Sequence, residues 1–532
     1  MKNKIAAFLI AFSISGGLGA QERRDLQDID FVKDINPWLT FSNAAGLTTL
    51  QTERSATACL EYDKTNGALK GISDSDDSHD VSISTEALIK VSKRMSLYGL
   101  LSYDYFYGKN MGGSVFWTPS YNPFDLIEFS ETTVGTKIKE RYKLIGALSY
   151  DIADNWAIGL RIDYTTGNYS KRKDPRYKNS MMDLEFSAGV RWSPSESFSI
   201  GLNALYLRKI ESISGKLYGY SAENYYTFVD YGGFWGNKEI FSTDNGYMPA
   251  ESSTRPMLNN IYGGAIQVST GRNIRTYHEL KYLRRNGFYG KRASTEVVYC
   301  EFAGNAISYD GSLVLSKGET YHKVSLGANY QGLKNQENIY RKSTQPGENT
   351  VTEYLGKKEV LDRTDVAAKI EYKGWTNVRH NRPEWEFGAS ILMNYRTFTT
   401  TIYPFYRMGN LCSFTADIFL GKDFTIKEKN IISVRFDLTA LYGFGNPRDD
   451  GQLASASSGK PLSADNYLEK DFEFRTAPRA GGLLAARYTR LMSAKYSIWF
   501  EISDTYSHSL QKLDYLTGND NNILSARIGF SF

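Results

Sequence analysis

Apolar and polar residues alternate along most of this chain, from about residue 54 to residue 532. In the segment 156–165 every second residue is apolar, beginning with Trp156 and Ile158, and the residues between them include Arg161 and Asp163. Successive side chains of a β-strand point to opposite faces, so this period of two predicts strands that each have one apolar face.

The same alternation predicts about 18 strands in all. They lie near residues 54–63, 81–91, 96–107, 138–151, 156–165, 181–192, 198–210, 260–269, 274–284, 305–316, 320–333, 364–375, 384–396, 410–421, 431–443, 480–490, 495–506 and 520–532. The pattern is weakest at 260–269, 274–284 and 410–421, so a total of 16 strands is the alternative.

A soluble β-sandwich also alternates in this way, and the ends of the apolar rows distinguish it from a membrane barrel. Here the rows end in aromatic residues, as at Tyr142 and Tyr150, at Trp156 and Tyr164, and at Trp192. Amphipathic rings prefer the boundary between lipid and water, and outer-membrane barrels carry two such girdles. The chain therefore predicts a transmembrane barrel.

The lengths of the connections give an independent indication. Short turns such as 92–96 and 151–155 alternate with longer segments, which are 108–137, 165–180, 211–259, 285–304, 334–363 and 444–479. Short periplasmic turns and long extracellular loops are typical of bacterial outer-membrane barrels, and an even strand number leaves both ends in the periplasm. We therefore expect an all-β, antiparallel, up-and-down barrel.

The first residues predict export. Lys2 and Lys4 precede an apolar run, and small residues lead to Ala20. This arrangement is typical of a secretory signal peptide over residues 1–20, used by the general secretory route. Residues 21–53 show no clean period and are expected to form a periplasmic or lumenal segment, followed by the barrel over residues 54–532. The predicted location is the outer membrane of a Gram-negative bacterium.

Composition agrees with this class. Aromatic residues make up 14% of the 532 residues, hydrophobic residues 41%, and the mean hydropathy is −0.42. A helical membrane protein would need spans of about 20 apolar residues, and a disordered chain would lack the aromatics. Removal of Lys2 and Lys4 lowers the formal charge from +4 to +2, which gives no reason to expect nucleic acid as a partner.

The last strand carries the most specific signal. Leu524, Ala526, Ile528, Phe530 and Phe532 alternate with polar or small residues up to residue 532. This resembles the C-terminal strand of outer-membrane proteins that the barrel-assembly machinery recognises. The resemblance implies that Phe530 and Phe532 serve as an assembly signal.

The mature chain also resembles a family of outer-membrane barrels of unknown function that is common in Bacteroidota. The matching features are Asn36-Pro37-Trp38, Tyr121-Asn122-Pro123, and Tyr177 after the basic run 171–176. Members are often encoded beside a TonB-dependent receptor and a surface lipoprotein, so the resemblance implies a role in nutrient uptake. The family has no agreed chemistry, and it supplies no catalytic residue.

Charged residues occupy the face of the strands opposite the apolar one. Since these side chains cannot face hydrocarbon, we expect them to line the lumen. The candidates are Arg141, Lys143, Arg161, Asp163, Asp183, Glu185, Lys369, Glu371, Arg435, Asp437 and Glu501. They predict either a charge ladder in a water-filled channel, or cross-strand ion pairs around the N-terminal segment.

The long loops are rich in aromatic residues that could bind a glycan, a peptide or a partner protein. The candidates are Trp117, Tyr121, Tyr225, Tyr226, Tyr231, Phe234 and Trp235. The alternative is that these rings pack together and cap the mouth of the barrel.

Two charged segments and one histidine complete the candidate chemistry. Asp74, Asp76, Asp77 and Asp80 form an acidic tip that either binds calcium or is simply solvated. The run 171–178 either forms a basic rim that contacts lipopolysaccharide or is simply solvated. His508 and its neighbour Ser509 point to opposite faces of a strand, so they do not form a catalytic pair, and we expect no enzyme activity and no other cofactor.

Two functions follow from these features. The first is a porin-like barrel for passage or uptake of a small solute, accessory to a TonB-dependent uptake complex. The second is a non-transporting scaffold with a filled barrel, whose loops bind a partner protein or glycan. A lumen occupied by residues 21–50, with no continuous water path left, would weaken the first hypothesis.

Overall fold

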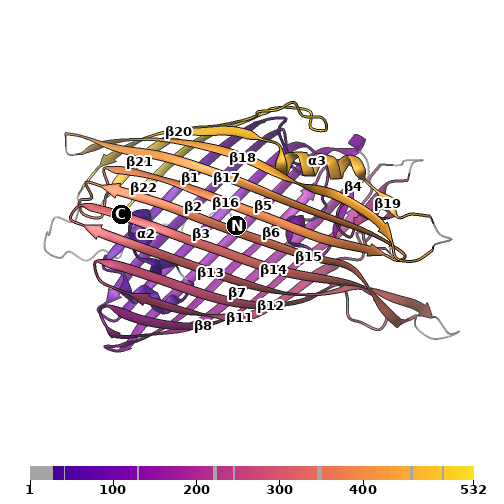
Figure 1. Cartoon of the computed structure of the whole chain (residues 1–532), viewed down its shortest axis with the longest axis horizontal. Helices are drawn as coiled ribbons and strands as arrows, with labels where there is room; N and C mark the ends of the chain where they lie inside the picture. The colour runs from indigo at the N-terminus through magenta and orange to yellow at the C-terminus, as the bar shows by residue number, and fades with distance from the viewer. Residues whose placement is uncertain are drawn as a thin grey trace.

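The computed structural model describes residues 28–40, 42–128, 131–219, 224–243, 246–343, 350–427, 429–455, 459–493 and 496–532. The predicted signal peptide, residues 1–20, lies outside this part of the chain. Eighteen antiparallel strands form one closed barrel, in which each strand pairs with the next along the chain (Figure 1). The last strand pairs with the first from Thr57↔Ser531 to Gly67↔Asn521, which closes the barrel.

All eighteen predicted strands are present, so the prediction of an up-and-down barrel is confirmed and the alternative of 16 strands is wrong. The barrel strands are β1 (Arg54–Gly67), β2 (Asp77–Ser92), β3 (Met95–Met111), β5 (Gly135–Ala153), β6 (Trp156–Lys171), β7 (Arg176–Ser195), β8 (Phe198–Lys216), β11 (Arg255–Thr270), β12 (Ile274–Gly290), β13 (Val298–Lys317), β14 (Thr320–Ser343), β15 (Val351–Thr376), β16 (Trp385–Ile402), β17 (Phe405–Ile426), β18 (Asn430–Gln452), β20 (Arg479–Leu491), β21 (Ser497–Ser509) and β22 (Asp520–Ser531).

The outer face of the barrel is apolar. Side chains such as Leu160, Ile391 and Ile418 are exposed on it, and aromatic residues such as Tyr142 and Tyr150 mark the two ends of the apolar rows. Exposed aliphatic rows of this extent are stable when lipid covers them. Among the described residues, no helix is long and apolar enough to cross a membrane.

Three of the predicted long loops, 165–180, 285–304 and 334–363, are largely strand. β6 and β7 extend through the segment 165–180, so only residues 172–175 separate them. β14 and β15 continue through much of 334–363 as a long hairpin. The sequence prediction failed here because the outer face of a strand meets water beyond the apolar belt, so the apolar row that marks a strand in the sequence is lost.

The other long loops fold back into one end of the barrel. They contribute a small sheet of β4 (Asp125–Glu128), β9 (Tyr226–Asp230), β10 (Trp235–Ile240) and β19 (Leu462–Ser463), with short 3-10 turns at Pro119–Tyr121 and Glu131–Thr133 and the helix α3 (Asp465–Thr476). Figure 1 shows α3 and this sheet at the end of the barrel opposite α2. We call these loop elements the cap.

Residues 28–53, which we call the plug, lie in the lumen near the other end. The plug consists of α2 (Ile29–Ile35), η1 (Pro37–Thr40) and η2 (Ala44–Thr49). Glycines in the wall make room for it: a Cβ on Gly159 would lie 2.1 Å from the Ala45 nitrogen, and one on Gly189 would lie 2.1 Å from Asn43 Oδ1. The N-terminal segment therefore has a lumenal position.

Candidate functional site

Two adjoining cavities lie inside the barrel on the side of the cap. The upper cavity, of about 450 Å³, is enclosed mainly by cap residues, and the lower one, of about 440 Å³, is lined mainly by the barrel wall. They share the lining residues Ser120, Arg396, Leu411, Phe474 and Arg475. We call the two cavities together the chamber. Each is large enough for a small organic solute.

The wall of the lower cavity follows from the strand register. Asn329, Ala367, Asn394 and Ser413 are neighbours across β14, β15, β16 and β17. Directly above them, a second row contains Gln331, Asp365, Arg396 and Leu411. These residues alternate with outward-facing ones such as Tyr395, so all project into the lumen. The result is a polar wall two rows deep.

The amide groups of this wall are available to a ligand. Within the described part of the chain, the side chains of Asn329, Gln331 and Asn394 make no hydrogen bond. An amide offers both donors and acceptors, and it loses free energy when it is enclosed without a partner. Water or a polar solute must therefore satisfy these groups.

The lower cavity is lined by more arginine side chains than acidic ones. Arg363 and Arg396 share Asp365, at 3.0 and 2.5 Å, and Arg475 pairs with Asp471 at 2.8 Å. The guanidinium of Arg479 lies 4.8 Å from the Phe474 ring centre.

No carboxylate lies within 4.0 Å of the Arg479 guanidinium among the residues that the structure describes. The lining of the lower cavity contains three arginines, Arg396, Arg475 and Arg479, but a single carboxylate, Asp365. The lower cavity therefore favours an anion.

The acids of the upper cavity belong to the cap, except for Asp74, which lies between β1 and β2. Asp125 and Asp230 are paired in the register of β4 and β9. Asp125 accepts hydrogen bonds from Ser114 Oγ at 2.6 Å and from the Leu126 nitrogen at 2.7 Å. Burial raises the pKa of Asp125 to about 8 and that of Asp230 to about 6. Asp125 is therefore mostly neutral at pH 7, which lowers the negative charge that faces the chamber.

All eleven charged residues predicted to face the lumen lie on the lumenal side of their strands. Arg161 and Asp163 share a face of β6 with Gly159, which contacts the plug. Their side chains are paired across and along the strands: Arg141–Asp104 at 2.9 Å, Lys143–Asp163 at 3.7 Å, Arg161–Asp163 at 2.9 Å, Arg161–Glu185 at 3.9 Å, Lys209–Asp183 at 3.0 Å, Lys369–Glu371 at 2.7 Å, Arg435–Asp437 at 2.8 Å and Arg487–Glu501 at 2.7 Å.

This arrangement corresponds to the ion-pair alternative rather than to a ladder of free charges. None of the eleven is among the described residues that line the chamber.

The aromatic loop residues form the cap. Tyr231 is 1% exposed and donates to Glu337 at 2.5 Å, and Trp235 is 3% exposed and donates to the Pro461 carbonyl at 3.3 Å. Phe234 stacks on Tyr467 with ring centres 6.3 Å apart. Burial removes these three rings from the outer surface, but Tyr231 and Phe234 line the upper cavity.

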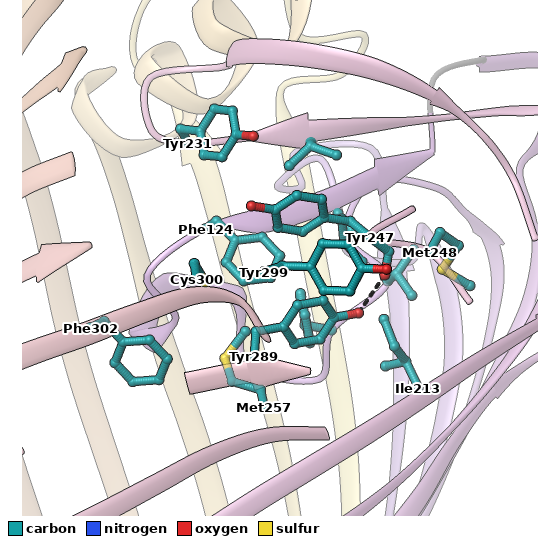
Figure 2. Close-up of a cluster of buried hydrophobic side chains, with 14 of the residues drawn as sticks. Phe124, Ile213, Tyr231, Tyr247, Met248, Met257, Tyr289, Tyr299, Cys300 and Phe302 are labelled. Carbon is teal, nitrogen blue, oxygen red and sulfur yellow. Dashed lines mark hydrogen bonds between the residues drawn. The ribbon is translucent and has the colours of Figure 1, made fainter. Parts of the chain in front are cut away.

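The remaining predicted rings also have partners. Tyr225 packs against the buried cluster, the Tyr226 ring faces Lys238 Nζ at 3.7 Å, and Trp117 lies 6.2 Å from Tyr169. Figure 2 shows how the cluster continues through Phe124, Tyr247, Tyr289 and Tyr299. Tyr121 differs from the other predicted rings, because it lines the lower cavity, with Arg285 3.9 Å from its ring centre.

The four aspartates predicted to form an acidic tip do not gather into one cluster in this structure. Asp77 is paired with Lys64 and Lys109, Asp76 lies 3.4 Å from Lys70, and Asp74 accepts from the Gly71 nitrogen at 3.1 Å. Asp80 lies within β2. The described residues contain no group of three side chains that could hold a metal ion. Lysines pair with Asp76 and Asp77 only, and calcium binding stays a prediction.

The basic rim is also smaller than predicted. Lys171 is buried and paired with Glu128 of the cap, together with Lys137. The exposed part of the run begins after it, at Arg172. A charge run in sequence does not show which of its members point inward, and the strand extension of β6 turns Lys171 toward the cap.

Of the chamber residues, Tyr121, Tyr231, Phe234 and Asp74 were candidates from the sequence, but the arginines and amides of the lower cavity were not. Arg475 and Arg479 lie in and after a helix within a segment predicted as a loop, and Asn394 and Arg396 lie at the end of a predicted strand. The alternation of Asn394 and Arg396 around Tyr395 was a signal for a lumenal position, but nothing in the sequence indicated that α3 would lie beside them.

Comparisons with known proteins place the chain in a family. Among solved structures, the ferric preacinetobactin receptor BauA from Acinetobacter baumannii is 9% identical, with a TM-score of 0.40, over 89% of this chain and 80% of that chain. The FrpB iron transporter from Neisseria meningitidis is 8% identical, with a TM-score of 0.35, over 92% and 83%. No curated protein matches. The model of a family of unknown function, DUF6850, matches residues 44–532, and the chain therefore belongs to this family.

Proposed function

We propose that this protein is an outer-membrane barrel that binds a small, polar, negatively charged solute in its chamber and allows it to pass when the plug and the cap move. The observation that carries the proposal is the lower cavity, with amides that lack protein partners and an excess of arginine. Arginine recognises carboxylate and phosphate groups through paired hydrogen bonds.

The outer surface supports the proposed location. Its exposed aliphatic rows are bounded by aromatic residues at both ends, as expected where a barrel crosses the outer membrane. The end with the cap then faces the medium, and the end with the plug faces the periplasm. In this orientation a solute from outside meets the cap first and the chamber next.

The attachments of the plug support a gated passage. Asp34 pairs with Lys323 at 3.0 Å and with Lys373 at 2.9 Å, and Lys33 pairs with Glu86. These contacts join the plug to opposite parts of the wall, β14–β15 and β2. The exposed fractions of these side chains are 11–25%, so the pairs are largely buried. A partner that pulls on the N-terminal segment has to break them to open the lumen.

Planar-bilayer conductance tests the proposal. We expect the wild-type barrel to conduct little, and a variant lacking residues 28–53 to conduct with a preference for anions. In that variant Arg479→Gln should reduce the anion preference, since it removes the unpaired charge in the chamber. Arg490→Gln, on the same strand but outside the chamber lining, is the matched control. A barrel that stays closed without its plug contradicts a passage function.

The scaffold is the second candidate, and the filled lumen favours it. Plug and cap both occupy the barrel, and the cap rings are buried. If the barrel without its plug is folded but does not conduct ions, the protein is a scaffold that presents its loops. Co-purification of the wild-type protein then identifies the partner, and a TonB-dependent receptor with its surface lipoprotein is the pair that we propose to test.

A further inference from the structure

A row of paired tyrosines and asparagines crosses the outer face of the barrel near the end with the cap. The tyrosines are about half exposed and belong to the apolar-facing side of β8, β11 and β12. The three hydrogen bonds are Tyr206 Oη to Asn260 Oδ1 at 2.9 Å, Asn286 Nδ2 to Tyr262 Oη at 3.1 Å, and Tyr282 Oη to Asn305 Oδ1 at 2.8 Å. Tyrosine at this height marks the level of the lipid headgroups.

Two arginines stand in this row. Arg208 is the register neighbour of Asn260, and Arg284 is that of Asn305, to which it donates at 2.9 Å. Within the described residues, neither guanidinium has a carboxylate within 4.0 Å. A cation on the lipid-facing side of a barrel costs free energy unless it reaches the headgroups and their anions.

A groove of about 440 Å³ adjoins the row. Ala303 forms its floor between Asn286 and Lys334, which flank it in the register of β12, β13 and β14. The small alanine leaves a hollow between two longer polar side chains. Glu301 is the acid of the groove, and it is already paired with Arg292 at 3.4 Å and with Lys357. The cations of the groove are paired as well, since Lys334 lies 3.3 Å from Glu359 and 2.9 Å from Asp362. The groove therefore presents mainly amide groups to a ligand, and, of the residues described here, the unpaired cations are the two arginines of the row.

We infer that this outer face of β8 and β11–β14 binds the phosphorylated sugar headgroup of a glycolipid in the outer leaflet. Arg208 and Arg284 bind the phosphate, and the asparagine and tyrosine side chains hydrogen-bond the sugar hydroxyls. Guanidinium groups match phosphate geometry, and basic sites at the headgroup level recognise lipid phosphates. The amide row and the groove favour a sugar over the small headgroup of a phospholipid. This inference is independent of passage through the lumen.

Lipid retention by the purified full-length protein tests the inference. Native mass spectrometry and unfolding temperature are measured in detergent micelles with diphosphorylated lipid A, dephosphorylated lipid A, phosphatidylglycerol or inorganic phosphate. We expect wild type to retain lipid A, and Arg208→Gln with Arg284→Gln to weaken retention by about tenfold, as for the loss of two charge-assisted contacts. The matched control is Lys93→Gln with Arg94→Gln, which removes the same charge at the opposite end.

Three results overturn the inference. If the arginine variant retains as much lipid A as wild type, the two arginines do not bind the phosphate. If wild type retains phosphatidylglycerol as well as lipid A, the surface binds any anionic lipid. If equimolar inorganic phosphate displaces lipid A, the site binds the free ion. Should the arginine variant fail to fold, Asn260→Ala with Asn286→Ala keeps both charges and tests the amide row. That variant should retain less lipid A than wild type and the same amount of phosphatidylglycerol. If it retains as much lipid A as wild type, the asparagines do not contact the sugar.

Discussion

At the scale of single residues, Asn43 ties the plug to the barrel wall. Its Nδ2 group donates to the Val190 carbonyl at 3.1 Å and to Gln267 Oε1 at 3.0 Å, and its Oδ1 atom accepts from the Ala45 nitrogen at 3.1 Å. Asn43 is 2% exposed, so these bonds form without competition from water. One amide thus fixes both the fold of η2 and its position.

Asn43→Ala should loosen the plug without unfolding the barrel. Removing a buried group that satisfies several partners costs about 1–3 kcal/mol. We expect faster amide hydrogen exchange over residues 28–53 and unchanged exchange in the strands. Asn155→Ala, at an exposed turn, is the control, and equal exchange in both variants would show that Asn43 does not hold the plug.

Asp125 should make the cap sensitive to pH. Burial raises its pKa to about 8, so the folded cap binds a proton more tightly than an unfolded one. Stability of the cap then falls as pH rises from the ordinary carboxyl value toward 8, by up to about 1.4 kcal/mol per pH unit, and is level above it. Protease sensitivity of the cap between pH 6 and 9 should rise and level off, and Asp125→Asn should remove this dependence.

At the scale of elements, the strands could be predicted because lipid imposes a period of two on every one of them. The cap could not, because its parts meet only through contacts between distant loops. β19, for example, pairs Ser463 with Trp235, and nothing local in either segment signals the other. The sequence indicated the plug segment, but the depth of the plug in the lumen depends on Gly159 and Gly189. That these glycines leave room for the plug becomes clear only when the register of the strands is known.

The last strand supports a prediction about assembly. Phe532 exchanges two backbone hydrogen bonds of 2.8 Å with Ala56, and Arg54 lies 5.1 Å from its ring centre. Phe532→Ser should therefore reduce the amount of heat-modifiable, folded barrel in the outer membrane. Phe424→Ser, which also removes an exposed ring from the outer face, is the control. Normal yield of the Phe532 variant would contradict an assembly role.

At the scale of the whole molecule, the two ends of the barrel have different chemistry. One end carries the cap and the long hairpin of β14 and β15, and the other carries the plug and most of the short turns. The barrel is therefore asymmetric along its axis, and we expect it to lie in the membrane in a single orientation.

Protease treatment tests that direction. In intact cells, added trypsin should cut after Lys216, whose side chain is 41% exposed, and should spare Lys93 and Arg94 in the turn between β2 and β3. Permeabilised cells should lose that protection. Cleavage of the turn in intact cells, with Lys216 spared, would show that the barrel has the opposite orientation.

The seam between β1 and β22 has a consequence for the timing of biogenesis. A wall that closes through its first and last strands does not exist until the last strand has been synthesised. Until then both strands present unpaired edges, which readily join other chains. The plug precedes β1, so it is already available when the circle forms around it. The order of segments along the chain thus allows the barrel to close around the plug, so the plug does not have to enter a barrel that has already closed.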